Sequence, residues 1–513
     1  MWRVLSGLAS LGLMRSAHPL ADVASLKRFI DGLPGDDDGK SLTLITACLE
    51  SWVLDEQQPL DCVVDGLRRL DRAAASRVLE LAREYQHALR PARRQEACLW
   101  TQVHGYWAAM AATCELLLHG LRQQQAANPE ALSWVCGRLI GALAHLFKWQ
   151  QLHYGPIAPE LWLRAGQALM LAEQHDVGEA AGRADEARQE YARLMALQAA
   201  SLNSLTPAQM DTAEMLIDHF VDGFALSSQP VAGAVYWIDP AGAMPAQRVS
   251  QAAELPLGRV RYMLPGQAHS AMADLLTQLD AGQAVPQELK RRGALAHTIR
   301  AVLPHLLDQF SALPLPRAHV RRAVRQRMAV LHGLPAAWQA FAWRKAGMAG
   351  GQSGESWVVE DASAGGFRAS LIWHGADWLK IGALLSLCPE GGDNWLLGCI
   401  RRCQRDPDGS AYIGIEVLGR QVQAVDFRLR PVVAGSYARA EVVPGLLILD
   451  AQDDDACRVI LPAGAFALKE SLGCLLGDVN YVLTPVCLLE QGGGFALACY
   501  SSPELRSRSM GGS

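Results

Sequence analysis

Apolar and charged residues alternate at helical spacing through the first two fifths of the chain, residues 20–222. An amphipathic helix places an apolar residue every three or four positions, so that one face packs while the other meets water. The clearest stretches of this kind are residues 63–82, 100–121, 130–149 and 160–173. They share no fixed repeat period. The pattern therefore predicts an irregular helical bundle over residues 1–223.

The pattern changes after residue 223. Residues 234–238 and 260–264 are strand-like, and the turn sequence Asp-Pro-Ala-Gly follows the first of them. Residues 286–310 return to helical spacing, and the proline-containing stretch 311–316 then ends the helix. We predict a small β insert with a helical connector over residues 224–315, and the sequence does not indicate its role.

Beyond Pro316 the apolar positions form short runs bounded by Gly, Pro, Asp or Asn. Strands of this length and spacing are typical of a small barrel. The runs that predict it are residues 328–333, 357–360, 367–372, 382–387, 395–402 and 412–418. A second set of runs predicts another β unit over residues 431–500, followed by a disordered tail at 501–513. The expected fold is α+β and multidomain, with the first barrel over residues 316–430.

Composition adds limits to this picture. The chain has 513 residues, of which 50% are hydrophobic and 19% charged, with a formal net charge of -5. This is globular composition with ample material for a core. A negative chain is not a general binder of DNA or RNA, so any site for a polyanion must be local. The apolar runs are far shorter than the ~20 residues that a membrane-spanning helix needs, so we expect no membrane span.

The 12 cysteines are scattered and lack the spacing of a zinc site, which favours free thiols in a reducing cytoplasm. Residues 1–13 faintly resemble a signal peptide. We interpret them instead as an amphipathic lead-in or as the product of an upstream start codon, with initiation at Met14. No disulfide framework follows, so we expect a cytoplasmic protein.

Three histidines of the helical region, His104, His145 and His153, invite a metal assignment. None is paired with a carboxylate or a second histidine at the i, i+4 spacing of a metal-binding helix. We therefore expect them in the core or in a groove. Trp100 and Trp107 lie seven residues apart on one helical face, which is the spacing of packing residues. We predict neither a metal nor a cofactor.

The most informative chemistry lies between residues 317 and 366. An arginine cluster comes first, and Asp361-Ala-Ser-Ala-Gly-Gly366 follows a strand-like segment and a glycine-rich loop. The planar guanidinium of arginine can grip phosphate with two hydrogen bonds, and a carboxylate can accept from the Watson–Crick edge of guanine. Glycines allow the close approach of a flat base or a phosphate. The pattern suits a guanine nucleotide that bears several phosphates. The arginines are Arg317, Arg321, Arg322, Arg325 and Arg327.

This order of motifs resembles the PilZ domain, the bacterial receptor module for cyclic di-GMP. PilZ domains combine an R-x-x-x-R segment with a [DN]-x-S-x-x-G turn on a six-stranded barrel. Arg321–Arg325 is similar to the first motif and Asp361–Gly366 to the second, although Arg317–Arg321 matches the first motif equally well. The resemblance covers about residues 316–430. It implies cyclic di-GMP as ligand and a binding site at Arg321, Arg322, Arg325, Asp361, Ser363, Gly365 and Gly366.

The resemblance further implies a receptor rather than an enzyme, and Arg368, Arg401 and Arg402 could add contacts. An arginine segment ahead of the barrel would close onto the ligand, reorient the helical region and so signal to an unknown protein partner. Two alternatives remain at this point. The chain could be a PilZ-like interaction protein that has lost the nucleotide, or an enzyme. No phosphate-loop, nucleophile-elbow or zinc-protease motif supports the enzyme.

Overall fold

The computed structural model describes residues 18–54, 59–87, 93–123, 128–176, 182, 184–249, 259–313, 319–345, 354–392, 394–431, 442–449, 456–477 and 479–501. Several predictions lie outside these residues: those for the N-terminal stretch, Arg317, the glycine-rich loop at 346–353 and the tail beyond 501. The chain divides between Leu315 and Pro316 into two compact units, except that residues 203–206 group with the second unit. The described fold is α+β and multidomain, as predicted.

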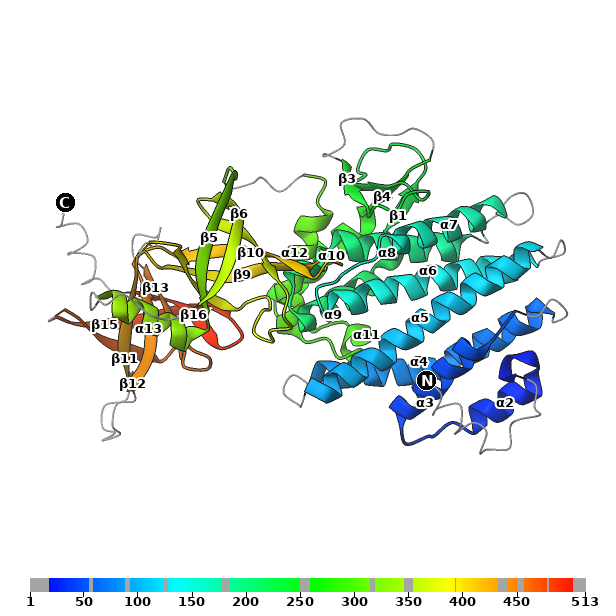
Figure 1. Cartoon of the computed structure of the whole chain (residues 1–513), viewed down its shortest axis with the longest axis horizontal. Helices are drawn as coiled ribbons and strands as arrows, with labels where there is room; N and C mark the ends of the chain where they lie inside the picture. The colour runs from blue at the N-terminus through cyan, green and yellow to red at the C-terminus, as the bar shows by residue number, and fades with distance from the viewer. Residues whose placement is uncertain are drawn as a thin grey trace. The chain divides into compact units, whose positions relative to one another are not determined.

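The first unit is helical, as its sequence period predicts. Helix α6 is buried along nearly its whole length and packs against α5, α7 and α8 (Figure 1). A helix that is apolar on all sides must lie inside its unit, which explains this central position. The helices are α2 (Val23–Asp31), α3 (Asp38–Ser51), α4 (Leu60–His87), α5 (Arg93–Gln123), α6 (Pro129–Gln151), α7 (Glu160–Gln174), α8 (Asp185–Ala199), α9 (Pro207–His219), α10 (Gly266–Asp280), α11 (Gln287–Arg291) and α12 (Ala296–Phe310).

The predicted β insert is present in the first unit as a small antiparallel sheet of order β1-β4-β2-β3. The two segments expected to pair do so, because Tyr236 lies opposite Met263 in the ladder. Helices α11 and α12 form the predicted connector. The strands are β1 (Ala225–Ser227), β2 (Tyr236–Ile238), β3 (Gln247–Arg248) and β4 (Arg261–Leu264).

The second unit contains two closed six-stranded barrels in its described residues, so both predicted β units are present. The first barrel has the order β10-β7-β6-β5-β8-β9 and the second β11-β12-β13-β16-β15-β14. Strands of the first barrel are β5 (Arg322–His332), β6 (Glu355–Ser363), β7 (Gly366–Ile372), β8 (Leu384–Pro389), β9 (Leu396–Arg405) and β10 (Ser410–Gly419). Those of the second are β11 (Val422–Pro431), β12 (Val442–Ile448), β13 (Ala456–Pro462), β14 (Glu470–Leu476), β15 (Val479–Gln491) and β16 (Phe495–Ser501).

The two barrels and helix α13 (Leu334–Lys345) share one hydrophobic core. Phe341 of α13, Leu397 of the first barrel and Leu446 of the second are all buried in the same cluster. Burial of this kind stabilises by roughly 25 cal/mol for each Å² of apolar surface removed from water. The barrels therefore form one unit.

Three features of the second unit differ from the sequence expectations. Strand β5 begins at Arg322 and not near Met328, because backbone pairing with β6 extends it through polar residues. Helix α13 follows β5 directly and was not predicted. The second barrel begins at Val422, ahead of the predicted boundary at residue 430, because β11 pairs with β12 and β14.

Candidate functional site

The turn between β6 and β7 carries the Asp-x-Ser-x-x-Gly motif. Ser363 and Gly366 face each other across this hairpin, and the Ser363 hydroxyl donates a hydrogen bond to the Gly366 carbonyl oxygen at 3.3 Å. A Cβ atom on Gly366 would lie 2.1 Å from the Ile415 carbonyl oxygen of β10. Only glycine therefore allows β7 to pair with β10 at this point. The Val417 amide of β10 donates to the Gly365 carbonyl oxygen at 3.0 Å and holds the turn in place.

Arg321 lies beside this turn. Its Nη1 atom is 2.8 Å from Oδ1 of Asp361, and the Arg321 side chain is 48% exposed. An ion pair this open to water contributes only about 0–1 kcal/mol to stability. A phosphate group can therefore replace the carboxylate as the partner of Arg321 at little cost to the fold. The structure thus joins the two predicted motifs through Arg321 and Asp361.

The other two predicted arginines lie elsewhere on the first strand. Arg322 is the first residue of β5 and pairs with Ala362, and Arg325 lies at an irregularity of the β5–β6 ladder between Ala323 and Gln326. Both side chains are exposed. Neither lines the cavity that Arg321 lines. The prediction that Arg322 and Arg325 precede the barrel is wrong, because backbone pairing includes both in β5.

The cavity beside the turn has a volume of about 610 Å³. Of the predicted site residues, Arg321, Ser363, Gly365 and Gly366 line it. Asp361 does not line it but accepts a hydrogen bond from Arg321, which does. Its other walls come from the outer face of strands β7, β10 and β9. The residues that line it there include Arg368, Arg401, Arg402, Gln404, Tyr412 and Gly414.

A row of three residues crosses this face. Gly414 of β10 lies opposite Arg368 on one neighbouring strand and opposite Arg402 on the other. Since Gly414 has no side chain, the surface between the two arginines is open. The guanidinium of Arg368 lies 4.5 Å from the ring centroid of Tyr412, two residues from Gly414 on the same side of β10. The row therefore presents two cations and an aromatic face around a shallow opening.

Arg402 lies in an unfavourable electrostatic environment on this face. The pKa of Arg402 is lowered by desolvation and by the positive charges of Arg321 and Arg368. A site in which cations destabilise one another gains free energy when an anion enters, since the anion relieves the repulsion. The three guanidinium groups therefore give this cavity a local positive charge, which favours an anion.

Arg401 behaves differently, although it also lines the cavity. Its Nη1 and Nη2 atoms lie 2.6 Å from the two carboxylate oxygens of Glu490, and its Nε atom lies 2.6 Å from Glu416. Burial opposes the charged form, but the two carboxylates outweigh it and raise the pKa of Arg401. This arginine is already neutralised by two carboxylates, so we assign it to holding β9, β10 and β15 together.

The sequence analysis did not single out Tyr412 or Gly414. Their spacing of two residues on a strand is a signal that they share one face. Their meeting with Arg368 and Arg402 depends on the strand order β7-β10-β9, which no local pattern reveals.

The three histidines of the helical region are half-buried and stack on tryptophan rings. The rings of His104 and His153 stack on Trp100 with centroids 4.3 and 4.8 Å away, and His145 stacks on Trp107 at 4.0 Å. In the part of the chain that the structure describes, no group of three or more His, Cys, Asp or Glu side chains is placed to hold a metal ion. Over the same residues, no helix is both long and apolar enough to cross a membrane.

The chain thus has a helical unit followed by a double-barrel unit, and the first barrel carries a cavity lined by arginines. Residues 24–231 match a family model described as "Cyclic-di-GMP receptor FimW, N-terminal domain". Over these residues the helical region is similar to the N-terminal domain of a family described as cyclic-di-GMP receptors. No curated protein matches the chain. The matched residues lie outside the barrel, so the barrel's PilZ resemblance remains a prediction.

Proposed function

We propose that the chain binds cyclic di-GMP in the cavity between Arg321, the Asp361–Gly366 turn and the Arg368–Gly414–Arg402 row. The observation that carries this proposal is that Arg321, Arg368 and Arg402 line one cavity, next to the partly buried carboxylate of Asp361. A cyclic dinucleotide has two phosphates for the guanidinium groups and two guanine bases. The similarity of the helical region to a family described as cyclic-di-GMP receptors supports this choice of ligand.

Each residue of the cavity then has a separate task. Arg321 and Arg402 donate charge-assisted hydrogen bonds to phosphate oxygens. The carboxylate of Asp361, released by Arg321, accepts from the Watson–Crick edge of a guanine. Tyr412 and the guanidinium of Arg368 offer stacking surfaces for a base, and Gly414 leaves room for it. Gly366 keeps the turn close to β10, so that Ser363 remains beside the ligand.

Ligand binding at Arg321 would be transmitted to the helical region. Arg321 lies a few residues after the division between the two units at Leu315 and Pro316. A partly exposed ion pair with Asp361 holds Arg321 in the free protein, and two phosphates attract it more strongly. The resulting movement reorients the helical region, which then signals to a protein partner.

Isothermal titration calorimetry with cyclic di-GMP, and with GTP as a control nucleotide, tests the assignment. We expect Arg321→Ala and Arg402→Gln each to weaken binding roughly ten- to hundred-fold, because each removes charge-assisted bonds to phosphate. Arg428→Ala is the matched control, since Arg428 is an exposed arginine on β11 of the other barrel. Its affinity should equal that of the wild type.

A further variant, Arg325→Ala, settles which arginines form the site. We expect a smaller loss than for Arg321→Ala, because Arg325 does not line the cavity. A larger loss would assign the R-x-x-x-R role to Arg325. No heat with the wild-type protein would reject nucleotide binding and favour a PilZ-like protein that docks partners through its helices.

A further inference from the structure

The helical unit contains a second cavity that the proposed function does not use. It has a volume of about 600 Å³ and lies between α4, α9 and the chain that joins α11 to α12, with α5 and α6 behind it. We call it the α4–α9 cavity. Protein interiors are close-packed, and an open space of this size is in the range of small-molecule sites.

One part of the α4–α9 cavity is apolar. Val78, Leu79 and Ala82 follow one another at helical spacing along α4, and Met215 of α9 and Leu295 face the same space. Leu79 is 45% exposed and Leu295 is 58% exposed. Two large apolar side chains that line a cavity and are left open to water indicate a surface that an apolar ligand would cover.

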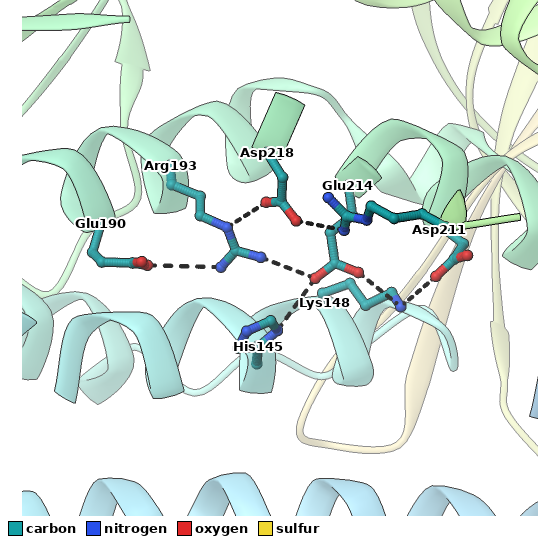
Figure 2. Close-up of polar contacts among 8 residues, drawn as sticks. His145, Lys148, Glu190, Arg193, Asp211, Glu214 and Asp218 are labelled. Carbon is teal, nitrogen blue, oxygen red and sulfur yellow. Dashed lines mark hydrogen bonds and ion pairs between the residues drawn. The ribbon is translucent and has the colours of Figure 1, made fainter. Parts of the chain in front are cut away.

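The charged residues of the cavity largely satisfy one another (Figure 2). Lys148 of α6 lies between Asp211 and Glu214 of α9, with Nζ 2.9 and 3.0 Å from their oxygens. Asp218 accepts from Arg193 of α8 at 2.5 Å and from Arg292 at 2.7 Å. This network holds the walls in place and offers an incoming ligand no uncompensated charge.

Two buried polar atoms that lack a hydrogen-bond partner belong to side chains of α5 and α6. Trp107 Nε1 and Arg138 Nε are buried and have no hydrogen-bond acceptor among the described residues. Both side chains line the cavity, Trp107 is 6% exposed, and the Arg138 guanidinium lies 4.9 Å from the centroid of the Trp107 ring. Buried donors are almost always paired. Both unpaired atoms are N–H donors, so the missing group is an oxygen acceptor.

We propose that the α4–α9 cavity binds a medium-chain aliphatic carboxylate. The carboxylate oxygens accept from Trp107 Nε1 and Arg138 Nε, and the alkyl chain lies along the Val78–Leu79–Ala82 face of α4, between Leu79 and Leu295. The site is independent of the proposed nucleotide site.

Calorimetric titration of the full-length protein with decanoate tests this proposal, and decylammonium serves as a probe of equal chain length whose head group only donates. We expect saturable 1:1 binding of decanoate, at least about ten-fold tighter than that of decylammonium, because a charged acceptor meets two buried donors. Trp107→Phe keeps an aromatic ring but removes one donor. It should weaken decanoate binding about five-fold or more, with little change for decylammonium.

A pair of variants on α4 locates the ligand. Ala75→Trp fills the cavity and should abolish binding, whereas Ser76→Trp places the same side chain on an exposed position of α4 outside the cavity and should leave binding unchanged. Equal binding by Ala75→Trp and Ser76→Trp would overturn the proposal. So would the absence of saturable heat with decanoate, or equal affinity for the two probes, since a partner segment or a water-filled space would then occupy the cavity.

Discussion

The buried lysine of the helical unit offers a quantitative test of how the unit is held together. Lys148 is 2% exposed, and Asp211 and Glu214 lie on either side of its ammonium group. Burial opposes the charged lysine, but these two carboxylates outweigh it and raise the pKa of Lys148. Replacement by methionine roughly conserves the side-chain volume but removes the charge and the hydrogen bonds that the ammonium group donates. The substitution Lys148→Met therefore leaves two carboxylates without their cation.

The cost of Lys148→Met follows from what remains around each carboxylate. Breaking a buried ion pair by removing one partner costs about 3–5 kcal/mol. Glu214 keeps Arg193 at 3.1 Å and His145 at 3.3 Å, and Asp211 is partly exposed, so we expect a value near the lower end, about 3 kcal/mol. Unfolding entropy is about 2.1 cal/mol/K for each residue, so a unit of roughly 300 residues should melt about 5 °C earlier.

Differential scanning calorimetry of the full-length protein measures this shift. The matched control is Lys40→Met, because Lys40 is an exposed lysine on α3 of the same unit. Its melting temperature should lie within about 1 °C of the wild-type value, as is usual for exposed positions. A Lys148→Met protein that melts together with the control would refute the reasoning, since the charged network of Figure 2 would then contribute nothing to stability.

Two further predictions concern the barrel and the pH response. Gly366→Ala should lower the melting temperature of the second unit and weaken cyclic di-GMP binding, because the new Cβ would lie 2.1 Å from the Ile415 carbonyl oxygen. Gly35→Ala is the control, since a Cβ at Gly35 meets open space and should leave the melting temperature unchanged. Burial and then the charge of Arg193 lower the pKa of His145 below its ordinary 6.5. The unfolded chain therefore takes up more protons, and thermal melts should show stability falling as the pH drops below about 6.5, with a flatter profile for His145→Gln.

The helical unit could be predicted from the sequence in most of its elements. The stretches at 63–82 and 130–149 lie within α4 and α6, because helical hydrogen bonds are local and a 3.6-residue period records them. Helix α13 was not predicted, because it lies among strands and its burial depends on contacts with both barrels. The start of β5 was not predicted, because the polar residues there, such as Arg322, do not alternate with apolar residues. Backbone pairing with β6 places them in the strand.

The candidate site, too, could be predicted from the sequence only in part. The sequence indicated Arg321, Asp361, Ser363 and Gly366 through motifs, and the structure places these residues around one turn. It indicated Arg322 and Arg325 equally strongly, yet their side chains lie outside the cavity, because the register of β5 on β6 decides which side chain reaches the turn.

By itself the sequence determined the class of each region and the local chemistry of the Asp361–Gly366 turn, because periodicity and turn geometry depend on neighbouring residues. Only the tertiary structure brought Arg368, Gly414 and Arg402 into one row, since strand order joins residues that are far apart in the chain. The same holds for the α4–α9 cavity. Trp107 and Arg138 belong to different helices. Their N–H groups become buried donors without an acceptor only when those helices pack together.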